Sequence, residues 1–200
     1  MENENYKVLY VASAFNEESN LWTLYQRCLS AFEKVQNKIQ TKKLSFQMLL
    51  IDNGSTDNTC KIIQEICKKD NRVFGVKNLK NYGSELSMSH GLDLAVKSSS
   101  DFIIMMCSDL QDPPELTTKM LLKLITNDDK YDSVFSYKKV SKGPIYMRYI
   151  RKLYYLILRF SDRDSKLISG FHGFACINLC SAESILWYLK NTNLNMRNSM

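Results

Sequence analysis

The chain has 200 residues, of which 44% are hydrophobic and 24% are charged. This length and balance exclude an intrinsically disordered chain and predict a single domain, large enough to bury a sheet together with its helices. The formal charge of +6 is a mild excess that suits an anionic partner, without choosing between phosphates, nucleic acid and lipid headgroups.

The six cysteines show no paired CxxC spacing, which argues against a zinc or redox motif. Several of them fall on apolar faces of expected helices or strands, so we expect reduced core residues of a cytoplasmic protein. The first seven residues are polar and carry no signal-peptide pattern. No apolar run is long enough to cross a bilayer.

Strands and helices alternate along the chain. Apolar runs predict the strands, and apolar residues spaced three and four apart predict the helices. The expected elements are a strand at 8–15, a helix at 21–39, a strand at 46–51, a helix through 60–67, a strand at 73–76, a helix at 84–97, a strand at 102–106, a helix at 115–126, strands at 133–137 and near 174–177, and a helix at 182–190. Ser55 or Thr56 is the candidate N-cap of the second helix. This repetition predicts an α/β fold with a doubly wound, mostly parallel sheet flanked by helices.

Three polar clusters, at 16–18, 52–57 and 109–112, each follow an expected strand. The carboxyl ends of parallel strands form the ligand crevice in such folds, so we expect the clusters to converge. In the last cluster, Asp109, Gln111 and Asp112 supply hard oxygen ligands that suit Mg²⁺ or Mn²⁺ holding a substrate phosphate. The alternative interpretation is a carboxylate-rich turn that caps the next helix.

Four motifs in order resemble the signatures of the family 2 inverting glycosyltransferases with the GT-A fold, a fold of nucleotide-diphospho-sugar transferases. The nearest branch is that of polyprenyl-phosphate and dolichyl-phosphate sugar transferases. The motifs are Ala14-Phe15-Asn16-Glu17-Glu18, Ile51-Asp52-Asn53-Gly54-Ser55-Thr56-Asp57, Asn81-Tyr82-Gly83 followed by Gly91-Leu92-Asp93, and Asp109-Leu110-Gln111-Asp112-Pro113-Pro114-Glu115. Four ordered motifs are far more specific than one.

The resemblance implies roles for individual residues. Asp109 and Gln111 would hold the Mg²⁺ or Mn²⁺ ion, and Asp112, expected with Asp109 in the catalytic set, would orient the turn or face the sugar. Asp52 would hydrogen-bond the base of the nucleotide. The full expected substrate-binding set is Phe15, Glu17, Asp52, Asn53, Ser55, Asn81, Gly83, Ser169 and Gly170.

Besides Ser13 or Ala14, where a Pro is usual, and Ser84, where a Lys is frequent, two departures from the family pattern bear on the expected site. Asn53 stands where a second Asp is common, and Cys107 replaces the usual first acid of the metal motif. A thiol is a poor ligand for a hard cation, so we expect either weaker metal affinity or a site completed by phosphates and water.

The segment 146–160 mixes aromatic and aliphatic residues with Arg and Lys. It can lie on a membrane surface and receive an anionic lipid, although a packed helix with solvated basic edges is the alternative. After residue 130 the candidate catalytic bases are Asp162, Asp164 and His172, but loop acids are usually only solvated, a lone loop histidine is more often structural, and none stands out. A lipid-phosphate acceptor would allow the absence of a base, because an ionised phosphate has no proton to remove. We expect residues 6–140 to bind the nucleotide and residues 141–200 to form the acceptor side.

The expected function is transfer of a sugar, with inversion, from a nucleotide diphosphate sugar, with uridine favoured, to a lipid phosphate or growing glycan. Nucleic acid is not an expected partner, and the expected location is the cytoplasm or the cytoplasmic face of a membrane. Relatives of this branch often continue into membrane helices, so the chain is either a fragment or a member with another anchor. The alternatives are a catalytically inactive nucleotide-sugar-binding module and, less favoured, a sugar nucleotidyltransferase, which would need a basic, glycine-rich phosphate loop where Phe15 to Glu18 stand.

Overall fold

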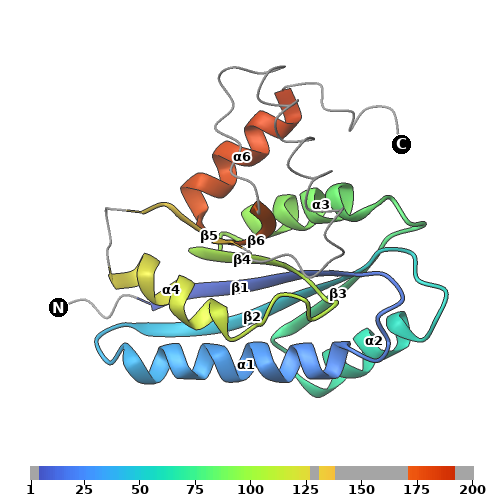
Figure 1. Cartoon of the computed structure of the whole chain (residues 1–200), viewed down its shortest axis with the longest axis horizontal. Coiled ribbons are helices and arrows are strands. Elements are labelled where there is room, and N and C mark those ends of the chain that lie inside the picture. Colours follow the sequence, from blue (N-terminus) through green and yellow to red (C-terminus); the bar gives the residue numbers. More distant parts are fainter. Residues whose placement is uncertain (1–4, 127–130, 138–170, 192–200) are drawn as a thin grey trace, which may run out of the picture. The chain divides into compact units, whose positions relative to one another are not determined.

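The computed structural model describes residues 5–126, 131–137 and 171–191 (Figure 1). The chain divides into two compact units, one formed by 1–134 with 174–200 and the other by 135–173. The expected membrane segment 146–160 and the site residues Ser169 and Gly170 lie outside the described residues. The single-domain expectation stays a prediction.

The described elements follow the expected alternation. In chain order they are β1 (Asn5–Ala14), α1 (Leu21–Lys38), β2 (Lys43–Asp52), α2 (Thr59–Lys69), β3 (Val73–Lys77), α3 (Ser84–Lys97), β4 (Phe102–Cys107), α4 (Leu116–Thr126), β5 (Ser133–Tyr137), β6 (Phe171–Asn178) and α6 (Leu179–Asn191). No helix within these ranges is long and apolar enough to span a bilayer.

The strands form one six-stranded sheet in the order β3-β2-β1-β4-β6-β5. β3, β2, β1 and β4 run parallel, whereas β6 is antiparallel to β4. The expected doubly wound, mostly parallel architecture is confirmed. In the register, Ala14 lies opposite Asp52, and Ser13 lies opposite Cys107. The carboxyl ends of β2, β1 and β4 are therefore level at one edge.

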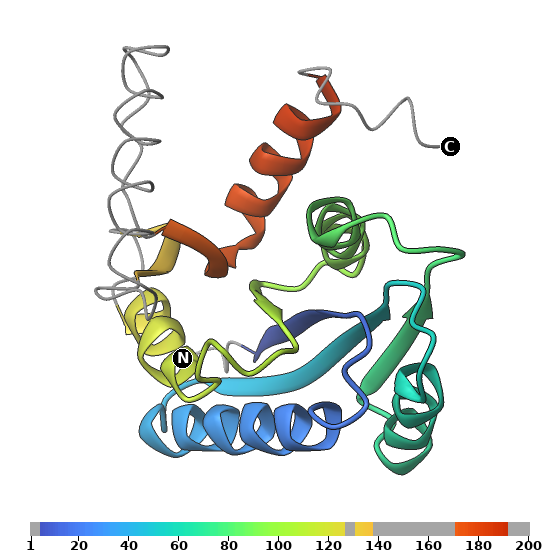
Figure 2. The same cartoon turned by 45° about the vertical axis from the view of Figure 1, so that its right-hand side comes forward.

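Unlike the edge strand β3, the parallel strands β2, β1 and β4 are buried on both faces. On one face, alternate residues of β1 such as Tyr10 and Ala12 pack with α1, α2 and α4, and on the other Leu9 and Val11 pack with α3 and α6 (Figures 1 and 2). Gly91 lets α3 approach closely, because a Cβ there would lie 2.6 Å from Val11 Cγ1. Burial on both faces explains why these strands read as continuous apolar runs.

The cysteines are not all core residues. Cys28 and Cys176 are buried, and burial raises the pKa of both thiols. Cys107 and Cys180 are exposed, so the expectation of core cysteines is wrong for these two. Cys107 is the last residue of β4, where the strand leaves the core, and Cys180 lies in the first turn of α6.

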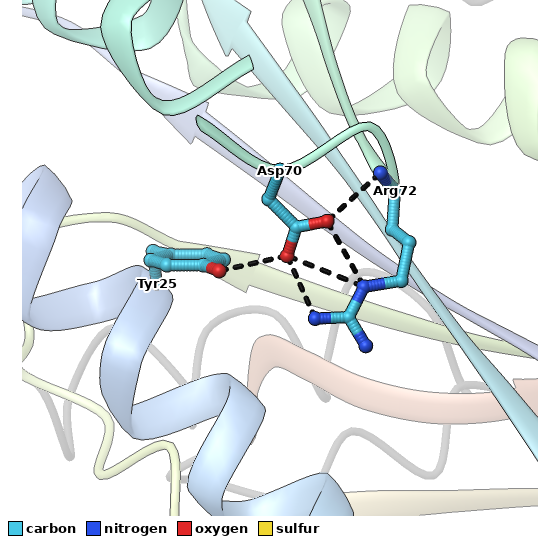
Figure 3. A network of polar contacts seen from close by, with 3 residues as sticks. All are labelled: Tyr25, Asp70 and Arg72. Carbon is cyan, nitrogen blue, oxygen red and sulfur yellow. Dashed lines mark hydrogen bonds and ion pairs between the residues drawn. The ribbon is translucent and has the colours of Figure 1, made fainter. Parts of the chain in front are cut away.

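Asp70 holds the turn between α2 and β3 at the edge opposite the polar clusters (Figure 3). Its Oδ2 accepts hydrogen bonds from Tyr25 Oη at 2.7 Å and Arg72 Nη2 at 2.8 Å, and its Oδ1 accepts from Arg72 Nε and backbone N–H, both at 2.9 Å. The hydrogen bonds from Arg72 hold the pKa of Asp70 well below its usual range. The network ties α1 to the start of β3.

We expect Asp70→Asn to lower the free energy of unfolding by about 1–3 kcal/mol at pH 7, because an amide cannot accept from all these donors. The pKa of Asp70 is lowered in the folded state, so its contribution is complete above the unfolded carboxyl pKa of about 3.9 and is lost as pH falls through the folded pKa. Urea unfolding should therefore show the gap between wild type and variant narrowing below pH 4. A gap that stayed constant down to pH 2.5, or an equal loss in Glu33→Gln on the exposed side of α1, would contradict this.

Candidate functional site

The loops after β1 and β2 are fastened to each other by side chains. Asn16 has a left-handed backbone (φ 55°), its N–H donates to Ser55 Oγ at 3.0 Å, and its Oδ1 accepts from the Thr56 N–H at 2.9 Å. The N–H of Glu17 donates to Thr59 Oγ1 at 2.8 Å. These contacts join two of the three polar clusters into one rigid rim.

The expected cap of α2 is wrong. Ser55 and Thr56 face Asn16, and the N-cap position is Asn58. Asp57 Oδ1 accepts the N–H of Thr59 at 3.0 Å. Burial raises the pKa of Asp57, but hydrogen bonds from Thr59 and from the Glu18 N–H outweigh it and leave that pKa below its ordinary value.

Asp52, the last residue of β2, carries the unsatisfied group of this rim. Its side chain is 1% exposed, and its Oδ1 accepts the N–H of Ser55 at 2.9 Å. Among the described residues, its Oδ2 is the only buried side-chain oxygen or nitrogen without a hydrogen-bond partner. Leaving a buried acceptor unpaired is costly, so this oxygen fits a donor supplied by a ligand.

Two further expected pocket residues follow β1, the strand paired with β2. Phe15 is 43% exposed although it is a large aromatic residue, and it follows Ala14, which lies opposite Asp52 in the register. Glu17 is half-buried, and its carboxylate accepts from Asn20 Nδ2. The rim therefore offers an exposed ring and a buried acceptor on adjacent strands, which suits a planar base with an N–H donor.

The loop 78–83 joins β3 to α3 and packs behind Asp52. The Asn78 N–H donates to the Asp52 carbonyl at 2.8 Å, and Asn53 Nδ2 donates to Asn81 Oδ1 at 3.0 Å and to the Gly83 carbonyl at 3.1 Å. Asn53, Asn81 and Gly83 were all expected in the substrate-binding set. The structure brings them together, with the polar groups of Asn53 directed at the protein.

The loop after β4 brings the third cluster to the same edge. Ser108 Oγ donates to the Ser13 carbonyl at 2.8 Å, which fastens this loop to β1. Leu110 has a left-handed backbone (φ 56°), and Asp109 Oδ1 accepts the N–H of Gln111 at 3.0 Å. Since β1 alone separates β2 from β4, the ends of these two strands lie about 10 Å apart, two strand spacings. The expected convergence of the clusters is confirmed for these strand ends.

The turn that follows is anchored from outside. Arg27 on α1 forms a bidentate ion pair with Glu115, with both N–O distances at 2.7 Å. The first amides of α4 donate to backbone, Leu116 N–H to the Pro113 carbonyl and Thr117 N–H to that of Pro114. The turn 109–115 is thus held at both of its ends.

The residues of this loop fit a hard cation as a partial ligand set. No group of three or more His, Cys, Asp or Glu residues able to hold a metal occurs in the described part of the chain. Asp109 is half-buried with one carboxylate oxygen engaged by the Gln111 N–H, and Gln111 is exposed. One carboxylate and one amide oxygen match a Mg²⁺ or Mn²⁺ ion that takes its other ligands from phosphates and water. Cys107 is exposed beside them and is too soft to replace an oxygen ligand.

A separate hollow of about 570 Å³ lies between α3, α6 and the end of β3. Asn78 and Tyr82 line it, whereas Asp52 and Asp109 do not. Its other lining residues include His90, Asp93 and Lys190, and Asp93 is ion-paired with Lys190 at 2.7 Å. The hollow adjoins the back of the loop 78–83 and is distinct from the rim.

Two glycines of the rim allow a matched test of its packing. Gly54 (φ 74°) and Gly83 (φ 85°) both have a positive φ, but a Cβ on Gly54 would lie 2.4 Å from the Lys80 carbonyl carbon, whereas one on Gly83 meets nothing within 4 Å. We expect Gly83→Ala to lower the free energy of unfolding by about 1–3 kcal/mol through backbone strain alone, because a φ of 85° with a ψ of 162° is a conformation that essentially only glycine adopts. Gly54→Ala should cost a further 1–3 kcal/mol or so, because the loop 80–81 must move. Urea unfolding measures both, and equal losses would show that the loop does not press on Gly54.

The family profile described as "Glycosyl transferase family 2" matches residues 11–185. The undecaprenyl-phosphate 4-deoxy-4-formamido-L-arabinose transferase of Shewanella sediminis is 30% identical over 147 residues, which are 73% of this chain and 40% of that protein. Among solved structures, S. aureus TarS 1–349 in complex with UDP has a TM-score of 0.54 at 14% identity, covering 90% of this chain and 48% of that one.

A third similar protein is the mannosyltransferase PcManGT of Pyrobaculum calidifontis, in complex with GDP-Man and Mn²⁺. It has a TM-score of 0.52 at 15% identity and covers 89% of this chain and 46% of that one. At these identities the structural likeness shows the fold alone, and the expected GT-A architecture is confirmed. The chain spans less than half the length of each of these three proteins.

Proposed function

Because the chain belongs to glycosyl transferase family 2, we propose that it moves a sugar from a nucleotide diphosphate sugar, with uridine favoured, to a lipid phosphate or growing glycan. The transfer inverts the anomeric carbon. The bond between the acceptor oxygen and that carbon forms while the bond to the diphosphate breaks, and the electron pair leaves on the nucleoside diphosphate.

The unpaired Oδ2 of Asp52 is the observation that carries this proposal. A buried carboxylate oxygen needs a donor, and the N3–H of uracil or the N1–H of guanine supplies one, whereas N3 of cytosine is itself an acceptor. Phe15, which follows the β1 residue paired with Asp52, is exposed and offers a ring against which a base can stack. The UDP and GDP-Man complexes of the two similar structures support a nucleotide of this kind.

The loop after β4 is suited to the diphosphate end of the donor. In this proposal Asp109 and Gln111 hold Mg²⁺ or Mn²⁺, and Asp112 orients the turn or faces the sugar. When bound, the cation neutralises charge that develops on the leaving diphosphate. The Arg27–Glu115 ion pair and the Ser108–Ser13 hydrogen bond keep this turn at the rim.

The proposed acceptor is a lipid phosphate, which the name of the Shewanella relative supports. An ionised phosphate needs no general base, so neither Asp109 nor Asp112 is required as one, and both can act on the donor side. The proposed place of action is the cytoplasmic face of a membrane, with the basic segment 146–160 and the residues Ser169 and Gly170 on the acceptor side. The segment 146–160 and the residues Ser169 and Gly170 lie outside the described residues, so their roles, like the place of action, stay predictions.

We expect Asp52→Asn to raise the Kd for UDP at least tenfold, about 1.4 kcal/mol. An amide keeps the shape of the side chain, but it cannot accept from Ser55 and from the base at once. Calorimetry in the presence of Mn²⁺ should show that wild type prefers UDP to CDP and that the variant loses this preference. An unchanged ratio of the two affinities would remove Asp52 from the base pocket.

We expect Asp109→Asn to abolish the Mn²⁺-dependent part of UDP binding while leaving the metal-free affinity unchanged, because a neutral amide is a weaker ligand for a hard cation. Calorimetry with and without Mn²⁺ separates the two parts, and Asp101→Asn, at the amino end of β4, is the matched control. Equal manganese dependence in wild type and Asp109→Asn would exclude Asp109 as a ligand.

The binding-module alternative is favoured by the exposed Cys107 at the metal motif. It is decided by donor turnover rather than by binding. Release of UDP from a panel of UDP-sugars with an undecaprenyl-phosphate acceptor supports the enzyme. Tight UDP binding with no release from any donor supports the module.

A further inference from the structure

We propose that Asn53 is a positioning residue, which holds the loop 78–83 and the start of α3 against the donor site without touching the substrate. This inference rests on the donor site proposed above, and it replaces the expected contact of Asn53 with the substrate by an indirect role.

Every hydrogen-bonding position of the Asn53 side chain is used within the protein. The side chain is 2% exposed. Its Nδ2 donates to Asn81 Oδ1 at 3.0 Å and to the Gly83 carbonyl at 3.1 Å, and its Oδ1 accepts from Asn78 Nδ2 at 3.0 Å and from the Tyr82 N–H at 3.2 Å. An asparagine amide offers two donor and two acceptor positions, so none remains for a ligand.

The pattern of partners requires an amide at this position. The two partners of Nδ2 are oxygen acceptors, and the two partners of Oδ1 are N–H donors. A carboxylate has nearly the same shape, but its second oxygen would face Asn81 Oδ1 and the Gly83 carbonyl, two oxygens that cannot donate in these contacts. Burial makes this repulsion severe. The Asp that is common at this position in family 2 glycosyltransferases could therefore not replace Asn53 here, because it could not donate to Asn81 Oδ1 and the Gly83 carbonyl.

Asn53 is coupled to the donor site through its neighbours in the chain and in space. It directly follows Asp52, whose Oδ2 is the proposed base acceptor. It precedes Gly54, which packs against the backbone of Lys80 and Asn81. A shift of Asn53 must therefore displace the carboxylate that precedes it or the loop that presses on the glycine.

The hydrogen-bond network continues from Asn53 into α3 and β1. Asn78 is 7% exposed, and besides Asn53 its Nδ2 donates to Ser87 Oγ at 3.4 Å. Ser13 Oγ donates to the same Ser87 oxygen at 2.8 Å. His90 Nδ1 lies 3.3 Å from Asn78 Oδ1, within hydrogen-bonding distance. The amide of Asn53 thus sits where the ends of β1, β2 and β3 meet the first turns of α3.

The test is Asn53→Asp, with Asn37→Asp on the exposed side of α1 as the control for the same change of charge. Calorimetry with UDP and Mn²⁺ is run at pH 7.5 and at pH 5.5. We expect the Kd of Asn53→Asp to rise at least tenfold at pH 7.5 and to recover in part at pH 5.5, because a carboxyl buried against two oxygens takes up a proton and can donate again.

The charged and titratable groups on the elements around this position include Asp52, Lys77, Lys80, Tyr82, Glu85 and His90. They are present in wild type and in both variants, so their own titration cancels when the pH dependence of Asn53→Asp is compared with the other two proteins. A recovery seen only in Asn53→Asp reports the carboxyl at position 53. A role in stability alone would not make the variant bind better at acid pH.

Hydrogen exchange of the backbone amides of residues 80–84 gives a second reading that does not depend on any ligand. Exchange should speed up at least tenfold in Asn53→Asp at pH 7.5 and stay unchanged in Asn37→Asp. Should Asn53→Asp fail to fold, Asn81→Ala removes one acceptor of the same amide from an exposed position. It should speed up exchange of the Tyr82 N–H, which donates to Asn53 Oδ1, whereas the Gly83 N–H donates to Asn81 itself and is left out of this comparison.

The outcomes separate this inference from the proposed function. If wild type binds no UDP, the proposed uridine site is wrong, and the exchange measurement still decides whether Asn53 holds the loop. If wild type binds UDP and Asn53→Asp binds it equally well at pH 7.5, the positioning role is wrong although the function stands. Weaker binding with no recovery at pH 5.5 and unchanged exchange also overturns it.

Discussion

The parallel pairing of β1 with β2 on one side and β4 on the other is the constraint from which the site follows. This pairing sets Ala14 level with Asp52 and Ser13 level with Cys107. Loops that are far apart in the sequence consequently begin side by side, and short side chains can reach across them. The Asn16–Ser55 and Ser108–Ser13 hydrogen bonds are possible only because of this register.

The buried polar side chains at the two ends of the parallel strands differ in whether all their hydrogen-bonding atoms have partners. At the edge of the α2–β3 turn, both carboxylate oxygens of Asp70 are paired, with Tyr25 and Arg72, which is what a structural network requires (Figure 3). At the opposite edge, Asn53 is fully paired but its neighbour Asp52 is left one partner short. This asymmetry supports the proposal that a ligand supplies the missing hydrogen-bond donor to Asp52.

Much of the architecture could be predicted from the sequence, because strands buried on both faces and amphipathic helices leave strong periodic patterns. The helix expected at 84–97 begins and ends at those residues, and the strand at 133–137 does too. The convergence of the clusters followed from the general rule for parallel sheets. The antiparallel direction of β6 carries no local signal, since a strand has the same pattern in either direction.

The hydrogen bonds of the rim could not be predicted. Ser55 and Thr56 have the composition of helix caps, but Asn16, which lies some forty residues away in the chain, takes their polar groups. Asn53 lies in the motif 51–57, which predicts a substrate contact, yet all four hydrogen-bonding positions of its amide are occupied by protein groups. Which partner a short polar side chain chooses depends on tertiary contacts, and local sequence does not contain them. The roles implied for Phe15, Glu17, Asp109, Gln111 and Asp112 stay predictions.

Gly91, in the middle of α3, has a consequence for how this chain can vary. Its missing side chain lets the helix rest almost directly on Val11 and Ile51, the strand residues that lead toward the rim. A larger residue there would press on Val11 Cγ1 and Ile51 Cδ1, and we expect the helix to shift away from the sheet together with the loop that precedes it. A change deep in the apolar interior would thus alter the geometry of the rim. We expect evolution to tolerate variation at the exposed residues of the rim more readily than at this buried glycine.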